Sequence, residues 1–221
     1  MRYRVRGVIV RSENAAKPAA QASKAVRDWL RRQPNVADAL DYGCGKLRYA
    51  VDIAARAKRV TFVDSAVQIM RPQCLLGRRT TILDLVKQRW PSSRVLDAGA
   101  FRGDARMYDL ALCANVLSAI PSRRARLDVL RAIRQRLKPN ALCLLVSQYR
   151  NSDFAAAASR PDAEPYQDGW LLRGRRVASF YAPLGAARLG AMARHAGFSV
   201  RETSLHDGAA LVVVVPEADP A

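Results

Sequence analysis

The sequence predicts an α/β fold, a three-layer sandwich in which helices cover both faces of a mainly parallel sheet. Short apolar runs of strand character alternate with longer stretches of helical periodicity along most of the 221 residues. This alternation is typical of crossover connections between parallel strands. Half of the residues are hydrophobic and 7% are aromatic, which suits a chain that buries one large core.

Five segments predict the parallel strands, because each is short, apolar and followed by turn or helical residues. They cover residues 37–41, 59–64, 93–97, 108–114 and 141–147. Four stretches predict the intervening helices, at residues 47–57, 66–76, 82–88 and 121–137. The last helix is the clearest, since its apolar residues recur at helical spacing and Pro139 follows its end.

The two ends of the chain predict further elements. A strand at 3–10 and a helix at 18–32 precede the first parallel strand. Near the other end, a helix at 184–195 is followed by Gly197, which suits a helix C-terminus. Two final strands are expected at 198–202 and 209–215.

Residues 151–183 interrupt the alternation and predict an insertion over the edge of the sheet. The segment holds several Pro and Gly residues, which disfavour long regular elements. Within it, residues 170–173 and 176–181 flank Gly174-Arg175 and predict a hairpin. We interpret the insertion as a lid or a substrate-binding segment.

The charge balance favours acidic partners. Thirty-seven Lys and Arg against nineteen Asp and Glu give a formal net charge of +18, enough for a positive field over much of the surface. Arginines cluster at the N-terminus (Arg2, Arg4, Arg6, Arg11), in the predicted helix at 121–137, and in the insertion (Arg173, Arg175, Arg176). A genomic preference for Arg codons and solvated helix faces is the alternative explanation.

Several classes of protein are disfavoured. The alternating charges of the first six residues are not followed by the apolar stretch of about 7 to 15 residues that a signal peptide has, so no signal peptide is expected. The longest apolar run, 209–215, is far short of the roughly 20 residues that span a bilayer. The four Cys form no CxxC pair and the two His are far apart, which argues against a metal site or a disulfide framework. We therefore expect a cytoplasmic protein without a membrane segment.

The most informative motif is a strand that ends in an acid and continues into a Gly-x-Gly turn. Asp41 is followed by Gly43 and Gly45, and a helix is expected directly afterwards. Glycine at these positions lets the backbone come close to a ligand. The next strand ends in Asp64, at the carboxyl edge where open α/β sheets bind ligands and where an acid can accept hydrogen bonds from a ribose diol.

From about Asp38 to its C-terminus the sequence resembles the class I S-adenosylmethionine-dependent methyltransferases. Asp41-Tyr42-Gly43-Cys44-Gly45 is similar to the first motif of that family, and Phe62-Val63-Asp64-Ser65 is similar to the second. The resemblance implies a Rossmann-like sandwich with a seven-stranded sheet, one strand of which is antiparallel, and S-adenosylmethionine as the cofactor. It places Gly43 and Gly45 against the methionine part and Asp64, next to Ser65, on the ribose hydroxyls.

Further motifs extend the resemblance. Asp97-Ala98 matches an acid and small residue that would bind the adenine amine, and Asp104-Ala105 is a rival for this role. Residues 109–117 are similar to the fourth motif, residues 137–140 to a Leu-Lys-Pro-Gly turn, and residues 196–198 precede the final hairpin. Two positions depart from the pattern: Leu47 stands where the third glycine is expected, and Asn140 replaces the glycine of the later turn.

The resemblance also implies where the reaction takes place. Methyl transfer mainly requires alignment and exclusion of water, so no catalytic triad is expected. Residues after the fourth strand normally face the methyl group, so Asn115, Val116 and Ser118 are candidates, with Asn115 also near the cofactor. Tyr149, together with Trp170, Phe180 and Tyr181, is a candidate lining residue of the acceptor pocket.

The methyl acceptor is not fixed by any motif. A nucleic acid, RNA or DNA, is favoured by the positive charge. One alternative is a small molecule held under the lid, and another is a noncatalytic nucleic-acid-binding protein on the same fold. The predicted organisation is an N-terminal strand and helix packing on the cofactor cleft (1–36), then a methyltransferase domain (37–221) with the lid-like insertion (151–183).

Overall fold

The structure is a computed structural model, and it describes residues 2–150, 159–174 and 177–218. Its main sheet has seven strands in the order β13-β14-β9-β8-β3-β4-β7. The strands are β3 (Val36–Tyr42), β4 (Ala57–Asp64), β7 (Arg94–Asp97), β8 (Tyr108–Ala114), β9 (Leu137–Gln148), β13 (Phe198–His206) and β14 (Ala209–Pro216). The predicted fold class is confirmed.

The register explains the strand pattern of the sequence. β3 runs parallel to both β4 and β8, and β4 runs parallel to β7. β3, β4 and β8 are largely buried, as their near-continuous apolar runs require, whereas β7 is partly exposed. β13 and β14 pair antiparallel, and β14 is buried from Ala209 to Val215. The apolar run near the C-terminus is therefore an internal strand.

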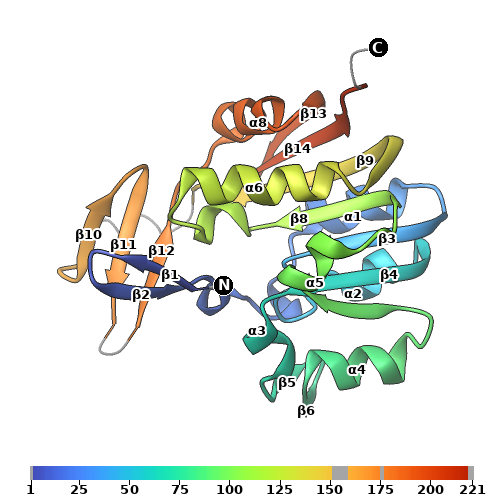
Figure 1. Cartoon of the computed structure of the whole chain (residues 1–221), viewed down its shortest axis with the longest axis horizontal. Helices are drawn as coiled ribbons and strands as arrows, with labels where there is room; N and C mark the ends of the chain where they lie inside the picture. Colours follow the sequence, from blue (N-terminus) through green and yellow to red (C-terminus); the bar gives the residue numbers. More distant parts are fainter. Residues whose placement is uncertain (1, 151–158, 175–176, 219–221) are drawn as a thin grey trace. The chain divides into compact units, whose positions relative to one another are not determined.

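Helices connect the strands (Figure 1). They are α1 (Lys24–Arg32), α2 (Ala50–Ala54), α3 (Ala66–Met70), α4 (Ile82–Arg89), α5 (Ala98–Gly103), α6 (Arg123–Arg134) and α8 (Ala186–His195), with short 3-10 turns η1 (Ser12–Ala15), η2 (Ala19–Gln21) and η3 (Leu117–Ala119). No helix in the described part of the chain is long and apolar enough to cross a membrane.

Several predicted helices are shorter in the structure. The helix expected at 18–32 is the 3-10 turn η2 followed by α1 from Lys24, and the helix expected at 121–137 is α6, which ends at Arg134. The helix expected at 47–57 is reduced to α2, because residues 45–49 form turns and Leu47 has a positive φ of 57°. The helix expected at 66–76 ends with α3, since Pro72 cannot continue it. A short hairpin follows instead, in which β5 (Gln73–Leu75) pairs with β6 (Arg78–Thr80).

The chain divides into two compact units, which are described separately. One comprises residues 16–113 and 135–143 and contains the Gly-x-Gly turn, and we call it the glycine-turn unit. The other comprises residues 1–15, 114–134 and 144–221. It contains a second, five-stranded sheet, and we call it the hairpin-sheet unit.

The five-stranded sheet joins the N-terminus to the insertion. Its order is β1-β2-β12-β11-β10, with β1 (Arg2–Val5), β2 (Val8–Arg11), β10 (Ala163–Tyr166), β11 (Gly169–Arg173) and β12 (Ala178–Tyr181). The expected strand at 3–10 is a hairpin instead, because Arg6 and Gly7 form a turn with φ values of 44° and 78°. Val10 pairs in parallel with Ala178, which links this hairpin to the insertion (Figure 1).

The hairpin predicted within the insertion is present. β11 and β12 pair antiparallel, with Trp170 opposite Tyr181 and Arg173 opposite Ala178. Residues 151–158 of the insertion and Arg175 and Arg176 lie outside the described residues.

Candidate cofactor site

The turn after β3 places its backbone against the end of β4. The amides of Gly43 and Cys44 both donate to the Val63 carbonyl oxygen, at 2.7 and 3.0 Å. Gly43 and Gly45 have φ values of 75° and 57°, which glycine adopts without strain. A Cβ on Gly45 would lie 3.3 Å from the Ala16 Cβ, so the space beside this turn is tight.

Asp64 fastens the turn from the end of β4. Its Oδ2 accepts a hydrogen bond from the Gly45 amide at 2.8 Å, and its Oδ1 accepts one from the Ser65 amide at 2.7 Å. Ser65 caps α3, because its Oγ accepts from the Gln68 amide at 3.2 Å. The two predicted binding residues Asp64 and Ser65 are therefore also the residues that shape the turn.

Asp41 is a buried carboxyl at the end of β3. Asp41 is 3% exposed, and its Oδ2 atom is buried without a hydrogen-bond partner among the described residues. Burial and the negative charge of Asp64 raise the pKa of Asp41 to about 7, although Arg48 acts in the opposite direction. Buried polar atoms without a partner are rare in folded proteins, so Asp41 is a candidate to accept a hydrogen bond from a ligand.

Gln68 is a residue of this site that sequence reasoning missed. It is fully buried on α3, and its Nε2 donates to the Gly45 carbonyl oxygen at 2.6 Å and to Gln73 Oε1 at 3.2 Å. The Gln73 Nε2 donates back to the Gln68 carbonyl oxygen at 3.0 Å. Gln68 Oε1 has no partner among the described residues. The available sequence signal was that Gln68 is a polar residue within the short apolar segment that forms α3.

Leu47 keeps the backbone geometry of the glycine that it replaces. It has a φ of 57° in the left-handed region, and its side chain is fully buried. Asn140, the other departure, has a φ of 64°, which Asn tolerates better than most residues. Leu47 lies in a turn and Asn140 lies within β9, and both adopt the positive φ that glycine favours.

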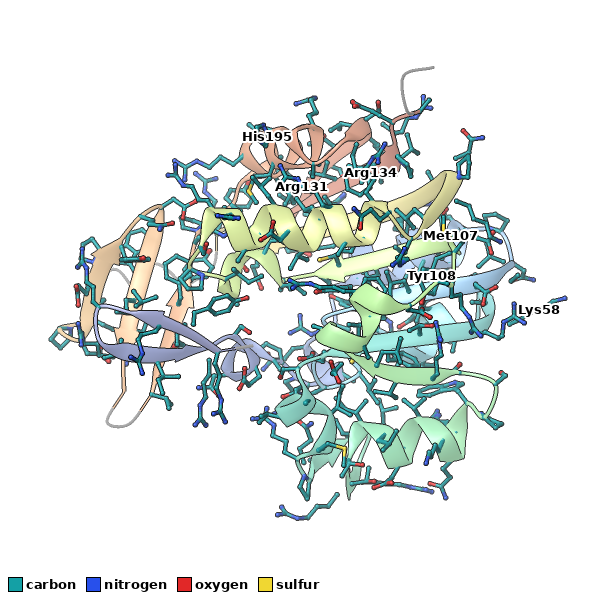
Figure 2. The ribbon with its side chains drawn as sticks, viewed as in Figure 1. Lys58, Met107, Tyr108, Arg131, Arg134 and His195 are labelled. Carbon is teal, nitrogen blue, oxygen red and sulfur yellow. The ribbon has the colours of Figure 1, made fainter. Side chains whose placement is uncertain are left out.

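Asp97 and Asp104, the two candidates for the adenine amine, have different roles. Asp97 lies in register with Asp64 on the neighbouring strand, and its Oδ1 accepts from the amides of Gly99 and Ala100, which caps α5 directly after it. Asp104 is held by Arg94 and by the hydroxyl of Tyr108, the residue labelled in Figure 2. Ala98 begins α5 beside Asp97. The carboxyl edge of the sheet therefore brings Asp97, rather than Asp104, level with Asp64.

The three catalytic candidates lie together in the hairpin-sheet unit. Asn115 has a φ of 60°, and its Oδ1 accepts from the Gln148 amide at 2.8 Å, next to Tyr149. Ser118 is buried, and its carbonyl oxygen accepts from the Ala182 amide at 2.9 Å. The Tyr181 hydroxyl donates to the Gln148 carbonyl oxygen at 2.8 Å, and burial raises its pKa. Asn115 therefore has a structural partner for its side chain.

Most of the basic residues in and after α6 are engaged within the structure. Arg126 is fully buried and binds both oxygens of Asp168, at 2.7 and 3.0 Å. Arg134, labelled with Arg131 in Figure 2, donates to the Gly197 carbonyl oxygen, and Arg131 lies 3.8 Å from Asp128. Lys138 binds Asp109 at 2.7 Å. The predicted positive helix is thus largely a set of structural contacts.

A cleft of about 440 Å³ lies in the hairpin-sheet unit. It is lined by Arg123, Leu127, Asp168, Leu184, Arg188, Ala191, Met192 and His195. None of the predicted site residues lines it.

Comparisons with known proteins agree with this geometry. A family model described as a methyltransferase domain matches residues 14–203. The Escherichia coli K12 protein YmfD, described as an uncharacterized protein, is 30% identical over 217 residues, which are 97% of this chain and 96% of that protein.

Two solved structures are also similar. An S-adenosylmethionine-dependent methyltransferase from Methanosarcina mazei has a TM-score of 0.62 at 14% identity, over 90% of this chain and 99% of that one. The 1,6-didemethyltoxoflavin-N1-methyltransferase of Burkholderia thailandensis, with 1,6-didemethyltoxoflavin and S-adenosylhomocysteine bound, has a TM-score of 0.58 at 17% identity, over 90% and 79% of the two chains.

The sheet order and the acid-x-Gly-x-Gly turn define the class I S-adenosylmethionine-dependent methyltransferases. The chain belongs to this family, since the methyltransferase model covers most of its length. Its cofactor is S-adenosylmethionine. The residues present fit this cofactor, because its ammonium and ribose hydroxyls are donors and the unpartnered oxygens of Asp41 and Gln68 are acceptors.

Proposed function

We propose that the chain transfers the methyl group of S-adenosylmethionine to a nucleic acid, with the cofactor held at the β3–α2 turn. The observation that carries the cofactor assignment is the buried, unpartnered Oδ2 of Asp41 beside the Gly43-Cys44-Gly45 backbone. In this proposal Asp41 accepts from the ammonium, Asp64 and Ser65 bind the ribose, and Asp97 with Ala98 binds the adenine.

The reaction needs little acid–base chemistry from the chain. When bound, the cofactor supplies an already activated methyl group on a sulfonium. The residues of the chain therefore bind, orient the acceptor and exclude water. Asn115, Ser118 and Tyr149 are assigned to the reaction chamber, where the hydrogen bond from Gln148 fixes the orientation of Asn115.

The five-stranded sheet supports the acceptor assignment. Residues of 1–36 and of the lid-like segment 151–183 share this sheet through the pairing of Val10 with Ala178. Arg2 and Arg4 are exposed on β1 and make no ion pair with any described residue. Exposed arginines without counter-ions suit phosphates, for which the guanidinium offers paired donors.

A small-molecule acceptor is the second candidate. The similar structure from B. thailandensis carries 1,6-didemethyltoxoflavin, so this fold accommodates small acceptors in that protein. A lid-like insertion suits such an acceptor as well. The two candidates differ in what carries the methyl group after the reaction.

A transfer assay separates them. Purified chain is incubated with methyl-labelled S-adenosylmethionine and, in separate reactions, with tRNA, rRNA fragments, DNA or a small-metabolite extract. We expect label in an acid-precipitable nucleic acid, lost in Asp64→Ala and retained in Asp128→Ala, whose carboxylate lies on the outside of α6. If the label is found only in the small-molecule fraction, the methyl acceptor is a metabolite and not a nucleic acid.

A further inference from the structure

We propose that one face of the five-stranded sheet is the docking surface for a single-stranded nucleic acid. We call it the arginine face, and its members include Arg2, Arg4, Ile9, Arg11, Trp170 and Leu172. The proposal rests on the proposed function, because it names the part of the chain that would hold the acceptor. It concerns the hairpin-sheet unit alone.

The strand register defines the arginine face. Directly paired residues of antiparallel strands lie on the same face. Arg2 is paired with Arg11 and Arg4 with Ile9, so these four side chains share one side of the β1–β2 hairpin. Val10 and its partner Ala178 lie on the opposite side.

The same alternation continues into β11 and β12. Phe180 and its partner Leu171 lie on the side of Ala178, and these three residues are buried. Trp170, which is paired with Tyr181, and Leu172 therefore lie on the arginine face. The side of Ala178 is packed into the unit. On the arginine face Tyr181 is also buried, whereas Trp170 and Leu172 are partly exposed.

The arginine face has positive charge without an internal counter-ion. Two acids of the insertion bind other arginines: Glu164 binds Arg6 and Arg173, and Asp168 binds Arg126. No ion pair joins Arg2, Arg4 or Arg11 to any described residue. Arg11 Nε is buried and has no hydrogen-bond partner in the described part of the chain.

The pairing of Arg2 with Arg11 is unfavourable in the isolated chain. Like charges directly opposite each other destabilise a strand pair, and neither arginine forms an ion pair with a described carboxylate to offset this. A bound polyanion removes the repulsion, since each guanidinium then faces a phosphate with two parallel donors.

The chemistry of the surface favours a single-stranded nucleic acid over other polyanions. Arg2 and Arg4 lie two residues apart on an extended strand, so their charges form a row that can follow an extended phosphate backbone. Ile9 is 40% exposed, and Trp170 is partly exposed on the same face. Unpaired bases stack on aromatic groups beside a positively charged track for the backbone. Trp170 lies on β11, which β2 and β12 separate from the arginines of β1.

The test measures binding of a fluorescent single-stranded oligonucleotide at several salt concentrations, without S-adenosylmethionine. The variant combines Arg2→Gln, Arg4→Gln and Arg11→Gln. The matched control combines Arg32→Gln, Arg79→Gln and Arg201→Gln, which removes the same charge from exposed arginines elsewhere. Each glutamine keeps a polar side chain and removes the charge, so the two variants lose the same net charge.

We expect the arginine-face variant to bind more weakly and with a smaller salt dependence. Loss of three phosphate contacts lowers the slope of log K against log salt by about 2 for a single strand. The control variant should keep the wild-type slope. Equal losses in the two variants would overturn the proposal, because binding would then follow net charge and not this face.

A second pair of variants tests stacking. Trp170→Leu keeps an apolar side chain but removes the aromatic ring, and we expect an affinity loss of about fivefold or more. Trp170→Phe keeps a ring and should restore most of the affinity. Equal affinity of the two variants would exclude a stacking role for this residue and contradict the proposal.

Further probes separate this inference from the proposed function. Tighter binding to anionic phospholipid vesicles or to an acidic polypeptide than to the oligonucleotide would overturn the nucleic-acid assignment. Normal S-adenosylmethionine binding without oligonucleotide binding would reject the arginine face and leave a small-molecule enzyme. A third outcome is that the chain fails to bind S-adenosylmethionine but binds the oligonucleotide through the arginine face. This outcome would reject the proposed function and leave the docking surface standing.

Discussion

Asp41 couples the stability of the chain to pH. Burial and the charge of Asp64 raise its pKa to about 7 from an ordinary 3.8, so the folded state favours the protonated carboxyl. The protonated Asp41 carboxyl therefore contributes to the free energy of unfolding. This contribution is fully present below about pH 4 and is lost as the pH rises through about 7. A carboxyl that resists ionisation in the free chain is suited to a cationic ligand group, which offsets that cost.

We predict that the free energy of unfolding of the wild type falls relative to that of Asp41→Asn between about pH 5 and pH 8. The difference changes by at most about 1.4 kcal/mol per pH unit. Urea denaturation of both chains across this range measures it. Parallel pH profiles would show that Asp41 is ionised throughout.

Leu47 shows that a residue can depart from a motif while the backbone retains it. A left-handed conformation costs a non-glycine residue roughly 1–2 kcal/mol, whereas burying a leucine contributes more than this. The fully buried side chain of Leu47 explains why the strained backbone persists.

We predict that Leu47→Gly destabilises the chain by about 1–3 kcal/mol, because the lost packing exceeds the relieved strain. Chemical denaturation measures this change, and Leu47→Ala, which keeps the strain, should be more destabilised than Leu47→Gly. The reverse order would mean that the backbone at this position is not strained.

Among the elements, α3 supports the glycine turn through one buried residue. Gln68 holds the Gly45 carbonyl oxygen at 2.6 Å, and no other described side chain is shown to bind that atom. We predict that Gln68→Met, which keeps the shape but removes the donor, weakens S-adenosylmethionine binding about fivefold or more, as one lost buried hydrogen bond implies.

The control for Gln68→Met is Gln88→Met, which makes the same substitution at an exposed residue whose side chain contacts Arg78. Calorimetric affinities of both variants decide the matter. Unchanged affinity in Gln68→Met, with the fold intact by circular dichroism, would mean that the turn keeps its geometry without this bond.

The α6 helix is anchored to the turn between β10 and β11 by the ion pair of the buried Arg126 with Asp168. Arg126 binds both oxygens of Asp168 and the Ile120 carbonyl oxygen, and it lies 5.6 Å from the Phe180 ring centre. Removing one partner of a buried pair leaves an uncompensated charge, which costs about 3–5 kcal/mol.

We predict that Arg126→Met destabilises the chain by this amount and that adding Asp168→Asn restores part of the loss. Thermal or urea denaturation of the single and double variants measures both effects. A double variant less stable than the single one would show that the Asp168 charge is not the source of the cost.

Most strands of the main sheet were predictable because buried strands leave continuous apolar runs, as in the parallel strand β8 and the antiparallel strand β14. Helix ends were less predictable. Leu47 and Pro72 both shorten helices, and only Pro72 carries a signal in the sequence. The N-terminal hairpin was not predicted, because Arg6-Gly7 lies within a run of alternating charge that suits one continuous strand.

The candidate site divides in the same way. Asp41, Gly43, Gly45 and Asp64 were predictable from one motif and one strand end, and the structure brings them together. Gln68 was not, because its role depends on where α3 packs. The arginines of α6 suggested a nucleic-acid surface, but most of them serve internal contacts, and partners such as Asp168 lie far away in sequence.

At the scale of the whole molecule, the central claim is that the glycine turn of this methyltransferase-family chain binds S-adenosylmethionine. Its most direct test is a calorimetric titration of the purified chain with S-adenosylmethionine, beside Asp64→Ala and the surface control Asp128→Ala. We expect binding by the wild type and the control, and a loss of about 1–3 kcal/mol in Asp64→Ala, because polar groups of the site lose their partner. Equal affinity of all three chains would contradict the claim.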